Sequence, residues 1–311
     1  MTTIKEALES CQEEYFLPGN SCCAGCGLEL ALRWAMKALG PNTALITPAS
    51  CLNVVIGLWP KTAPNFPFTN MAFAAGAAAA TGMSAAFKAK AYRYPGGKWD
   101  QMTTITFAGD GGTADIGIQG LSGAAERNSD QIYVCYDNEA YMNTGIQRSS
   151  STPHGAITTT TTKGKDRYKK NLPAILAAHE IPYVATCAIS EPLDLFDKFK
   201  KAKSIKGCKY IHILAPCPPG WGYNSNESIE LSRLAVKTGA WILYEIENGI
   251  MKLSKRSKTL LDSSKRIPLI EYLSLQKRFA KLSEKDIMEL QGEIDRNWTR
   301  IVNQLSCQQE D

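Results

Sequence analysis

Apolar residues return along the chain with two different periods. Between residues 27 and 40 they recur at helical spacing, at Leu28, Leu32, Ala35, Met36 and Leu39, which predicts an amphipathic helix. Short apolar runs at residues 43–50, 103–109 and 131–137 have the length and composition of buried strands. Further helices are predicted over residues 172–179, 192–203 and 227–237, and further strands over residues 182–188, 209–215 and 241–246. This alternation predicts an α/β fold with a mostly parallel sheet and helices on both faces.

Residues 103–147 form the central unit of this pattern, a strand, a glycine turn, a helix over about residues 116–127 and a strand that ends at Asp137. In a parallel sheet ligands bind where the strands end. The turn glycines, Gly109, Gly111 and Gly112, allow close approach to a phosphate. Mg²⁺ prefers oxygen ligands, which the Asp110 carboxylate, the Asn138 amide and the carbonyl of Ala140 supply. We therefore interpret the unit as a magnesium-diphosphate site; the alternative is an ordinary turn with a capping asparagine.

Four of the ten cysteines form a second pattern. Cys23 and Cys26 are a CxxC pair at the start of the first helix, whereas Cys51 and Cys217 each follow a predicted strand. Four thiolates suit either a [4Fe–4S] cluster or structural zinc. Their dispersal along the chain and their place beside a cofactor favour iron and sulfur. Cys22 could replace Cys23, but the spacing to Cys26 would then be CxxxC, so we favour Cys23.

Composition excludes several classes of protein. With 311 residues, 44% of them apolar, and a formal charge of +5, the chain can bury a large core and is not disordered. It has no long basic run that indicates nucleic acid. The first residues lack the order of a signal peptide, and the most apolar run, residues 71–87, is too short to span a membrane. These features favour a cytoplasmic protein that neither binds nucleic acid nor enters a membrane.

The chain divides into residues 1–250, the α/β domain, and residues 251–311, a partly helical extension that we expect to dock another subunit. Within the first part, the Ser/Thr-rich residues 143–170 are too long for a simple connection and predict a lid or an interface arm. In the second part, Ser283 and Asp286 predict a capping box at the start of the final helix.

The motifs together resemble a known family. They are CAGCG at residues 23–27, SC at 50–51, GDGG at 109–112, DNEAYMNTGIQRS at 137–149, TTT followed by GK at 160–165, and APCPPGW at 215–221. In this combination the chain is similar to the β subunit of the 2-oxoacid:ferredoxin oxidoreductases, the family of pyruvate:ferredoxin oxidoreductase. The resemblance covers about residues 18–250.

This resemblance implies the diphosphate half of a thiamine diphosphate site and one [4Fe–4S] cluster. It implies that Asp110, Asn138 and the Ala140 carbonyl hold Mg²⁺, that the four cysteines hold the cluster, and that Asn143 faces the substrate. The remaining expected cofactor contacts are Gly109, Gly111, Gly112, Thr144 and Gly145. One departure is that Gly19-Asn20 stands where family members commonly have Gly-His, so the role of that histidine is in doubt here.

The function implied by the resemblance is oxidative decarboxylation of a small 2-oxoacid, with pyruvate first and oxalate next. Electrons would pass through the cluster to ferredoxin, and coenzyme A would usually take the acyl group. No glutamate of this chain has a motif context for activating thiamine, which implies an α subunit, besides γ and ferredoxin-like δ subunits or fused equivalents. The alternatives are a non-redox thiamine-dependent decarboxylase or synthase half with structural cysteines, and a non-catalytic iron–sulfur subunit.

Overall fold

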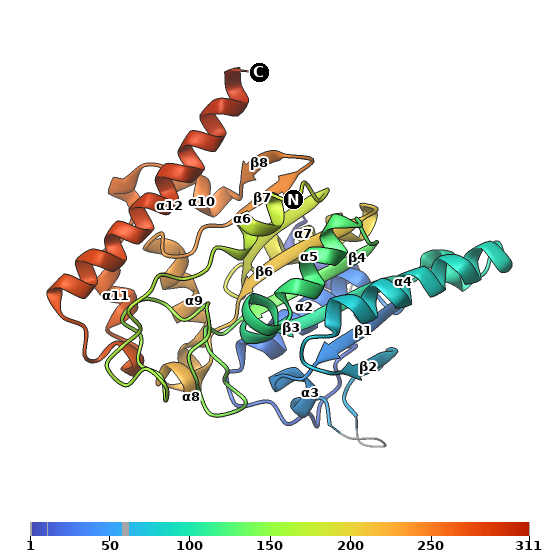
Figure 1. Cartoon of the computed structure of the whole chain (residues 1–311), viewed down its shortest axis with the longest axis horizontal. Coiled ribbons are helices and arrows are strands. Elements are labelled where there is room, and N and C mark those ends of the chain that lie inside the picture. The colour runs from blue at the N-terminus through green and yellow to red at the C-terminus, as the bar shows by residue number, and fades with distance from the viewer. Residues whose placement is uncertain (1, 11, 58–61, 311) are drawn as a thin grey trace.

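The computed structural model describes residues 2–10, 12–57 and 62–310, and its centre is a twisted sheet of eight strands in the order β2-β1-β3-β4-β6-β5-β7-β8 (Figure 1). Neighbouring strands are parallel from β2 to β5, and β7 and β8 are antiparallel at one edge. The strands are β1 (Thr43–Pro48), β2 (Phe68–Met71), β3 (Thr103–Gly109), β4 (Gln131–Asp137), β5 (Tyr183–Ala188), β6 (Cys208–Leu214), β7 (Tyr244–Glu247) and β8 (Ile250–Leu253).

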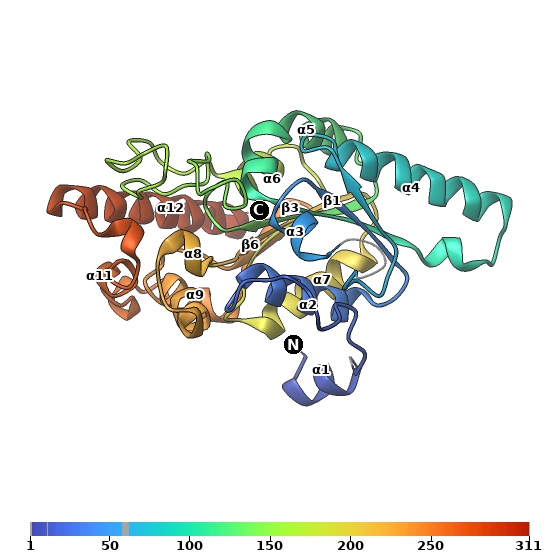
Figure 2. The same ribbon diagram turned by 90° about the horizontal axis from the view of Figure 1, so that it is seen from below.

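Helices cover both faces of this sheet, as the sequence pattern predicted (Figure 2). α2 (Gly27–Leu39) and α7 (Pro192–Ser204) pack against each other on one face, with α1 (Ile4–Ser10) outside them. α4 (Gly76–Arg93), α5 (Ile118–Glu126) and α6 (Leu172–Ala177) lie on the other face. Two hydrophobic cores lie on opposite faces of the sheet, and alternate residues of β4 pack into each of them. Val134 and Tyr136 pack on the α2 side, whereas Tyr133 and Cys135 pack on the α5 side.

A third core cluster joins the later part of the chain to the sheet. It includes residues of α9 (Ser228–Lys237), α11 (Leu269–Leu273) and α12 (Glu284–Glu310), and α10 (Lys255–Thr259) lies nearby along β8. The predicted capping box is confirmed at the start of α12, where the Ser283 backbone N–H donates to Asp286 (2.8 Å) and the Asp286 N–H donates to Ser283 Oγ (3.2 Å). The predicted C-terminal helix is therefore present and packs on the α/β part.

The sequence pattern missed or misplaced some local features. Strand β2 was not predicted, because it is short and only partly buried at the edge of the sheet and has no clear alternation. The strand expected over residues 241–246 is β7, shifted and antiparallel. Glu191 occupies the N-cap position of α7, without a side-chain hydrogen bond, and Pro192 begins the helix. Within the part of the chain that the structure describes, no helix combines the length and hydropathy needed to cross a bilayer.

Candidate functional site

The glycine turn predicted after β3 is itself helical. Asp110 is followed by a π-helical turn, Gly111–Ile116, before α5 begins. A π turn often marks a functional position in a helix. Glycine is needed at 111 because a Cβ there would lie 2.4 Å from the Tyr141 ring. The Thr113 hydroxyl donates to the Gly109 carbonyl (2.8 Å) and fixes the turn.

Asp110 is completely buried at the head of this turn. Burial, together with the negative charge of Asp137, raises the pKa of its carboxyl well above the usual range, and the hydrogen bond from Ser149 Oγ only partly opposes this. A buried carboxylate of this kind is stabilised by a cation. The local chemistry of Asp110 therefore favours a bound positive charge.

Asn138 and Ala140 stand opposite Asp110, just beyond the end of β4. One terminal atom of the Asn138 amide lies 2.8 Å from Asp110 Oδ1 and 3.0 Å from the Ala140 carbonyl oxygen. With the amide nitrogen in this position both contacts are hydrogen bonds; with the amide oxygen there, it lies close to an oxygen of Asp110 and to that of Ala140. Because Mg²⁺ takes such oxygen ligands, the three predicted residues fit a magnesium ion.

These groups line a cavity of about 120 Å³ at the ends of β1, β3 and β4. Eight of the nine predicted cofactor contacts line it, namely Gly109, Asp110, Gly111, Gly112, Asn138, Ala140, Asn143 and Thr144. Gly145 does not line the cavity but bends the adjoining loop, where its φ is +118°. Cys51 also lines the cavity, so a predicted cluster ligand lies at the cofactor site itself.

Behind the Asn138 loop lies a network of buried charges. Lys169 Nζ is 2.7 Å from both Asp137 and Glu139, His212 Nε2 is 2.7 Å from Asp137, and Arg278 is 2.6 Å from Glu139. Burial opposes ionisation of Asp137, but the Lys169 charge and the His212 hydrogen bond outweigh it and lower the pKa of Asp137 to about 2. The network holds the two neighbours of Asn138 in place, including Glu139 at φ +68°.

Trp221 connects the Asn138 loop to the cysteine segment. Its indole Nε1–H donates to the Asn138 carbonyl oxygen (2.7 Å), and its side chain is fully buried. The Arg278 guanidinium lies 3.7 Å from the centroid of the Trp221 ring. Trp221 ends α8 (Pro218–Trp221), whose preceding residue is Cys217. This hydrogen bond therefore links α8, which follows the predicted cluster ligand Cys217, to the loop of Asn138, a predicted magnesium ligand.

The four predicted cluster cysteines come together at the same edge of the sheet. The loop of Cys23 and Cys26 packs against residues 215–216, where the Gly27 N–H donates to the Pro216 carbonyl (3.1 Å) and a Cβ on Gly27 would lie 2.8 Å from that backbone. Burial, followed by the charge of Cys217, raises the pKa of the Cys51 thiol to about 12. Burial and the charges of Cys26 and Cys23 raise the pKa of Cys217 to about 12.

Burial and neighbouring thiols disfavour ionisation of Cys51 and Cys217, and a cationic iron–sulfur core would stabilise their thiolates. Among the described residues no group of three or more Cys, His, Asp or Glu side chains has the geometry of a site for one metal ion. Cys22, the alternative to Cys23, hydrogen-bonds Cys26, and this contact is the main cause that lowers the pKa of Cys26 to about 7. The choice between Cys22 and Cys23 stays a prediction.

Asn20, where family members commonly have histidine, organises the cysteine loop. Its Oδ1 accepts a hydrogen bond from the Cys22 N–H (3.0 Å), and its Nδ2 donates to Glu29 (3.3 Å). Asn20 is not among the residues that line the cavity. In this chain the residue therefore contacts the loop and the first turn of α2.

Sequence reasoning missed several residues of the site. Ser149 donates to Asp110, and Asp115 accepts hydrogen bonds from the Tyr141 hydroxyl (2.9 Å) and the Ser150 N–H (3.1 Å). These contacts tie the Ser/Thr-rich residues 143–170 to the glycine turn. Lys165 fixes the same segment through the carbonyls of Ser150 (3.0 Å) and Thr152 (2.5 Å). The only sequence signal was the density of hydroxyl residues after Asn143, which does not indicate partners.

The comparisons with known protein families and with related sequences agree with one another. Residues 56–213 match the family described as "Thiamine pyrophosphate enzyme, C-terminal TPP binding domain". Pyruvate synthase subunit PorB of Methanothermobacter thermautotrophicus is 49% identical, over 91% of this chain and 96% of that protein. Ketoisovalerate oxidoreductase subunit VorB of Pyrococcus horikoshii is 43% identical, over 96% of each chain.

Among solved structures, the 2-oxoglutarate:ferredoxin oxidoreductase from Magnetococcus marinus superposes with a TM-score of 0.54 at 21% identity, covering 71% of this chain and 79% of that chain. This likeness shows a shared fold. The sequence identities to PorB and VorB over nearly the whole chain agree with the family expected from the motifs. The chain therefore belongs to the 2-oxoacid:ferredoxin oxidoreductases, as a β subunit that carries a thiamine diphosphate-binding domain.

Proposed function

We propose that this subunit takes part in the oxidative decarboxylation of a small 2-oxoacid, with pyruvate as the first candidate and oxalate as the second. The observation that carries the proposal is the cavity in which Asp110, Asn138 and Ala140 face one another, with Cys51 at its edge. A diphosphate-magnesium site and a redox centre at the same sheet edge are what one-electron oxidation at a thiamine cofactor requires. Bound thiamine diphosphate would supply the electron sink for loss of carbon dioxide.

The residues of this chain would position the reactants. Asp110 and Asn138 would hold Mg²⁺ through their side chains, and Ala140 through its carbonyl. The turn glycines would let the backbone approach the diphosphate. A Cβ at Gly111 or Gly112 would also meet the ring of Tyr141 or Phe73. Asn143 lines the cavity on its exposed side and would hydrogen-bond the substrate. Cys23, Cys26, Cys51 and Cys217 would hold the [4Fe–4S] cluster.

The balance of the reaction defines the partners. With pyruvate, each carboxylate and one coenzyme A thiol would give carbon dioxide, an acyl thioester, one proton and two electrons, which ferredoxin would accept one at a time. No glutamate lines the described cavity, since Glu139 turns its carboxylate to Arg278 and Lys169. An α subunit would supply the activating glutamate. The γ and ferredoxin-like δ subunits, or fused equivalents, would carry electrons onward, and residues 251–311 would dock one of these subunits.

The test is a screen of 2-oxoacids with the anaerobically purified complex and a viologen acceptor, with and without coenzyme A. Reduction that depends on pyruvate and on coenzyme A supports the first candidate. Reduction by oxalate without coenzyme A would select the second, because no acyl group remains to be transferred. Release of carbon dioxide without reduction of the viologen would contradict the redox function.

A further inference from the structure

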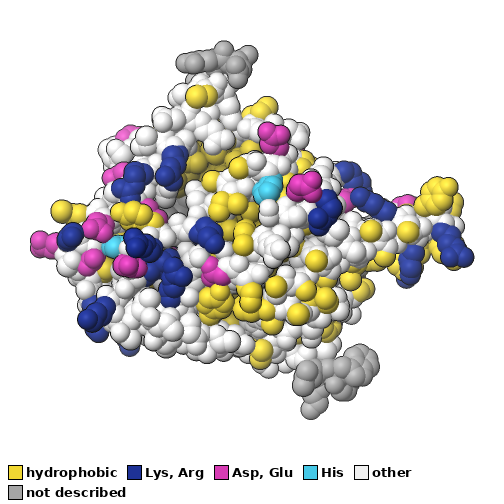
Figure 3. Space-filling view, viewed as in Figure 1, with side chains coloured by type: hydrophobic (Ala, Val, Ile, Leu, Met, Phe, Trp, Pro, Cys, Tyr) yellow, Lys and Arg dark blue, Asp and Glu magenta, His cyan; other side chains and the backbone are white. Residues whose placement is uncertain are grey.

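A second and larger cavity lies on the other side of the Asn138 loop. It has a volume of about 680 Å³, within the range of small-molecule sites. α12 forms one wall, and the sheet and α6 form the other. In the space-filling view, hydrophobic side chains gather between α12 and α6, with Lys and Arg side chains along the α12 side (Figure 3). We call this space the α12 pocket.

The interior of the α12 pocket is apolar. It is lined by Leu214, Ile242, Met251, Leu273 and Ile294, together with other aliphatic and aromatic side chains. Three of its interior polar side chains already have partners within the chain. Thr186 Oγ1 donates to the Ile242 carbonyl (2.7 Å), Trp241 Nε1 donates to the Cys187 carbonyl (2.9 Å), and the His212 ring contacts Tyr210 and Asp137. A buried ligand body would therefore gain from being apolar.

The charges at the inner end are also paired. Lys169 lies between Asp137 and Glu139, and its backbone N–H hydrogen-bonds the Glu293 carboxylate. A charged ligand group placed there would have to displace an existing ion pair. The inner end thus gives no reason to expect a charge on the buried part of a ligand.

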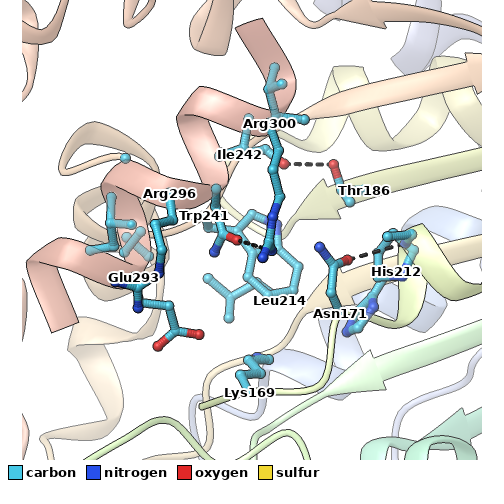
Figure 4. A pocket seen from close by; sticks show the side chains of 18 of the residues that line it. Lys169, Asn171, Thr186, His212, Leu214, Trp241, Ile242, Glu293, Arg296 and Arg300 are labelled. Atoms are coloured by element: carbon cyan, nitrogen blue, oxygen red, sulfur yellow. Dashed lines mark hydrogen bonds between the residues drawn. The ribbon is translucent and has the colours of Figure 1, made fainter. Parts of the chain in front are cut away.

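The mouth of the pocket is different. Arg296 and Arg300 come from successive turns of α12, and Arg300 extends into the pocket across from Asn171 and His212 (Figure 4). Arg300 Nη1 donates to the neutral side chain of Asn297 (3.3 Å), and the Arg296 guanidinium lies 4.8 Å from the Tyr168 ring centroid. Neither of these partners is negatively charged, but Arg296 also interacts electrostatically with the Glu293 carboxylate. Two guanidinium groups at an opening favour a carboxylate.

We propose that the α12 pocket binds an apolar organic carboxylate, with its hydrocarbon body inside and its carboxylate at Arg296 and Arg300. The pocket is separate from the proposed thiamine site, although Glu139 lines it while its neighbours Asn138 and Ala140 line the other cavity. The proposal therefore does not depend on the identity of the 2-oxoacid.

Decanoate is a suitable probe, with butanoate as a carboxylate of short chain. Calorimetric titration of the intact complex should show saturable binding of decanoate and at least tenfold weaker binding of butanoate. The double variant Arg296→Gln/Arg300→Gln should weaken decanoate binding about tenfold or more, since it removes both charges. Lys285→Gln is the matched control, because it removes one charge from α12 outside the pocket and should leave the affinity unchanged.

A second variant tests the cavity itself. Ala177→Phe fills space at a half-buried lining position and should abolish decanoate binding while the complex still assembles. Absence of saturable decanoate binding to the intact complex would overturn the proposal. This result is expected if a partner subunit fills the pocket. Binding that neither variant changes would overturn it as well.

Discussion

Replacing Trp221 by phenylalanine tests whether the segment after Cys217 positions the Asn138 loop, which we propose binds magnesium. The change removes the Nε1–H that donates to the Asn138 carbonyl at 2.7 Å and leaves an aromatic ring for Arg278 to stack on. Because both groups are buried, the unpaired carbonyl should cost about 1–3 kcal/mol. If that loss falls on the loop in its cofactor-binding conformation, the affinity for thiamine diphosphate with Mg²⁺ falls about 5- to 150-fold, since 1.4 kcal/mol is a factor of ten.

Trp298→Phe is a closely matched control. Trp298 is also buried, donates its Nε1–H to a backbone carbonyl, that of Gly239 (3.0 Å), and carries a stacked guanidinium, that of Arg266 (4.1 Å). Both variants should lose similar stability on thermal unfolding. Only Trp221→Phe should weaken cofactor binding in calorimetric titrations of the complex. Equal effects on cofactor affinity, or none, would refute the positioning role.

Three further predictions follow from the site. Asp110→Asn keeps the shape but removes the charge, so Mg²⁺-dependent cofactor binding should fall at least tenfold while iron content is unchanged; retained affinity in titrations would remove Asp110 from the ligand set. Cys217→Ser should lower the iron and sulfide content of the anaerobic complex, and wild-type content would exclude this ligand. Burial and nearby positive charges lower the pKa of Lys165 to about 8, so above this pH the native chain releases a proton that the unfolded chain keeps up to about pH 10. Wild-type stability should therefore rise with pH relative to Lys165→Met across that range, and parallel Tm curves would contradict this.

The arrangement of the sheet was predictable because buried strands leave a strong pattern. The run of residues 131–137 is β4 itself, and its alternate residues pack on opposite faces. In contrast, β2 is a short edge strand whose exposed and half-buried residues carry little periodic signal. The position of β7 was shifted because Trp241 and Ile242 look like strand residues but line the α12 pocket ahead of it.

The closeness of Asp110, Asn138 and Ala140 was predictable because they follow strands β3 and β4, whose ends lie side by side in the sheet. The contacts of Ser149 and Trp221 were not, since their partners, Asp110 and Asn138, lie far from them along the chain. Only the folded path of residues 143–170 and of α8 brings these groups into contact. The α12 pocket was hidden for the same reason, because its walls come from both predicted parts of the chain.

The most direct test of the central claim is electron paramagnetic resonance of the anaerobic complex mixed with pyruvate. We predict iron, sulfide, magnesium and thiamine diphosphate in the purified complex, and a reduced [4Fe–4S] signal that appears after pyruvate is added. Asp110→Asn, which keeps the cysteines, should retain the iron but lose the pyruvate-dependent signal. A complex that contains zinc in place of iron, or whose cluster stays oxidised with every 2-oxoacid tried, would contradict the account.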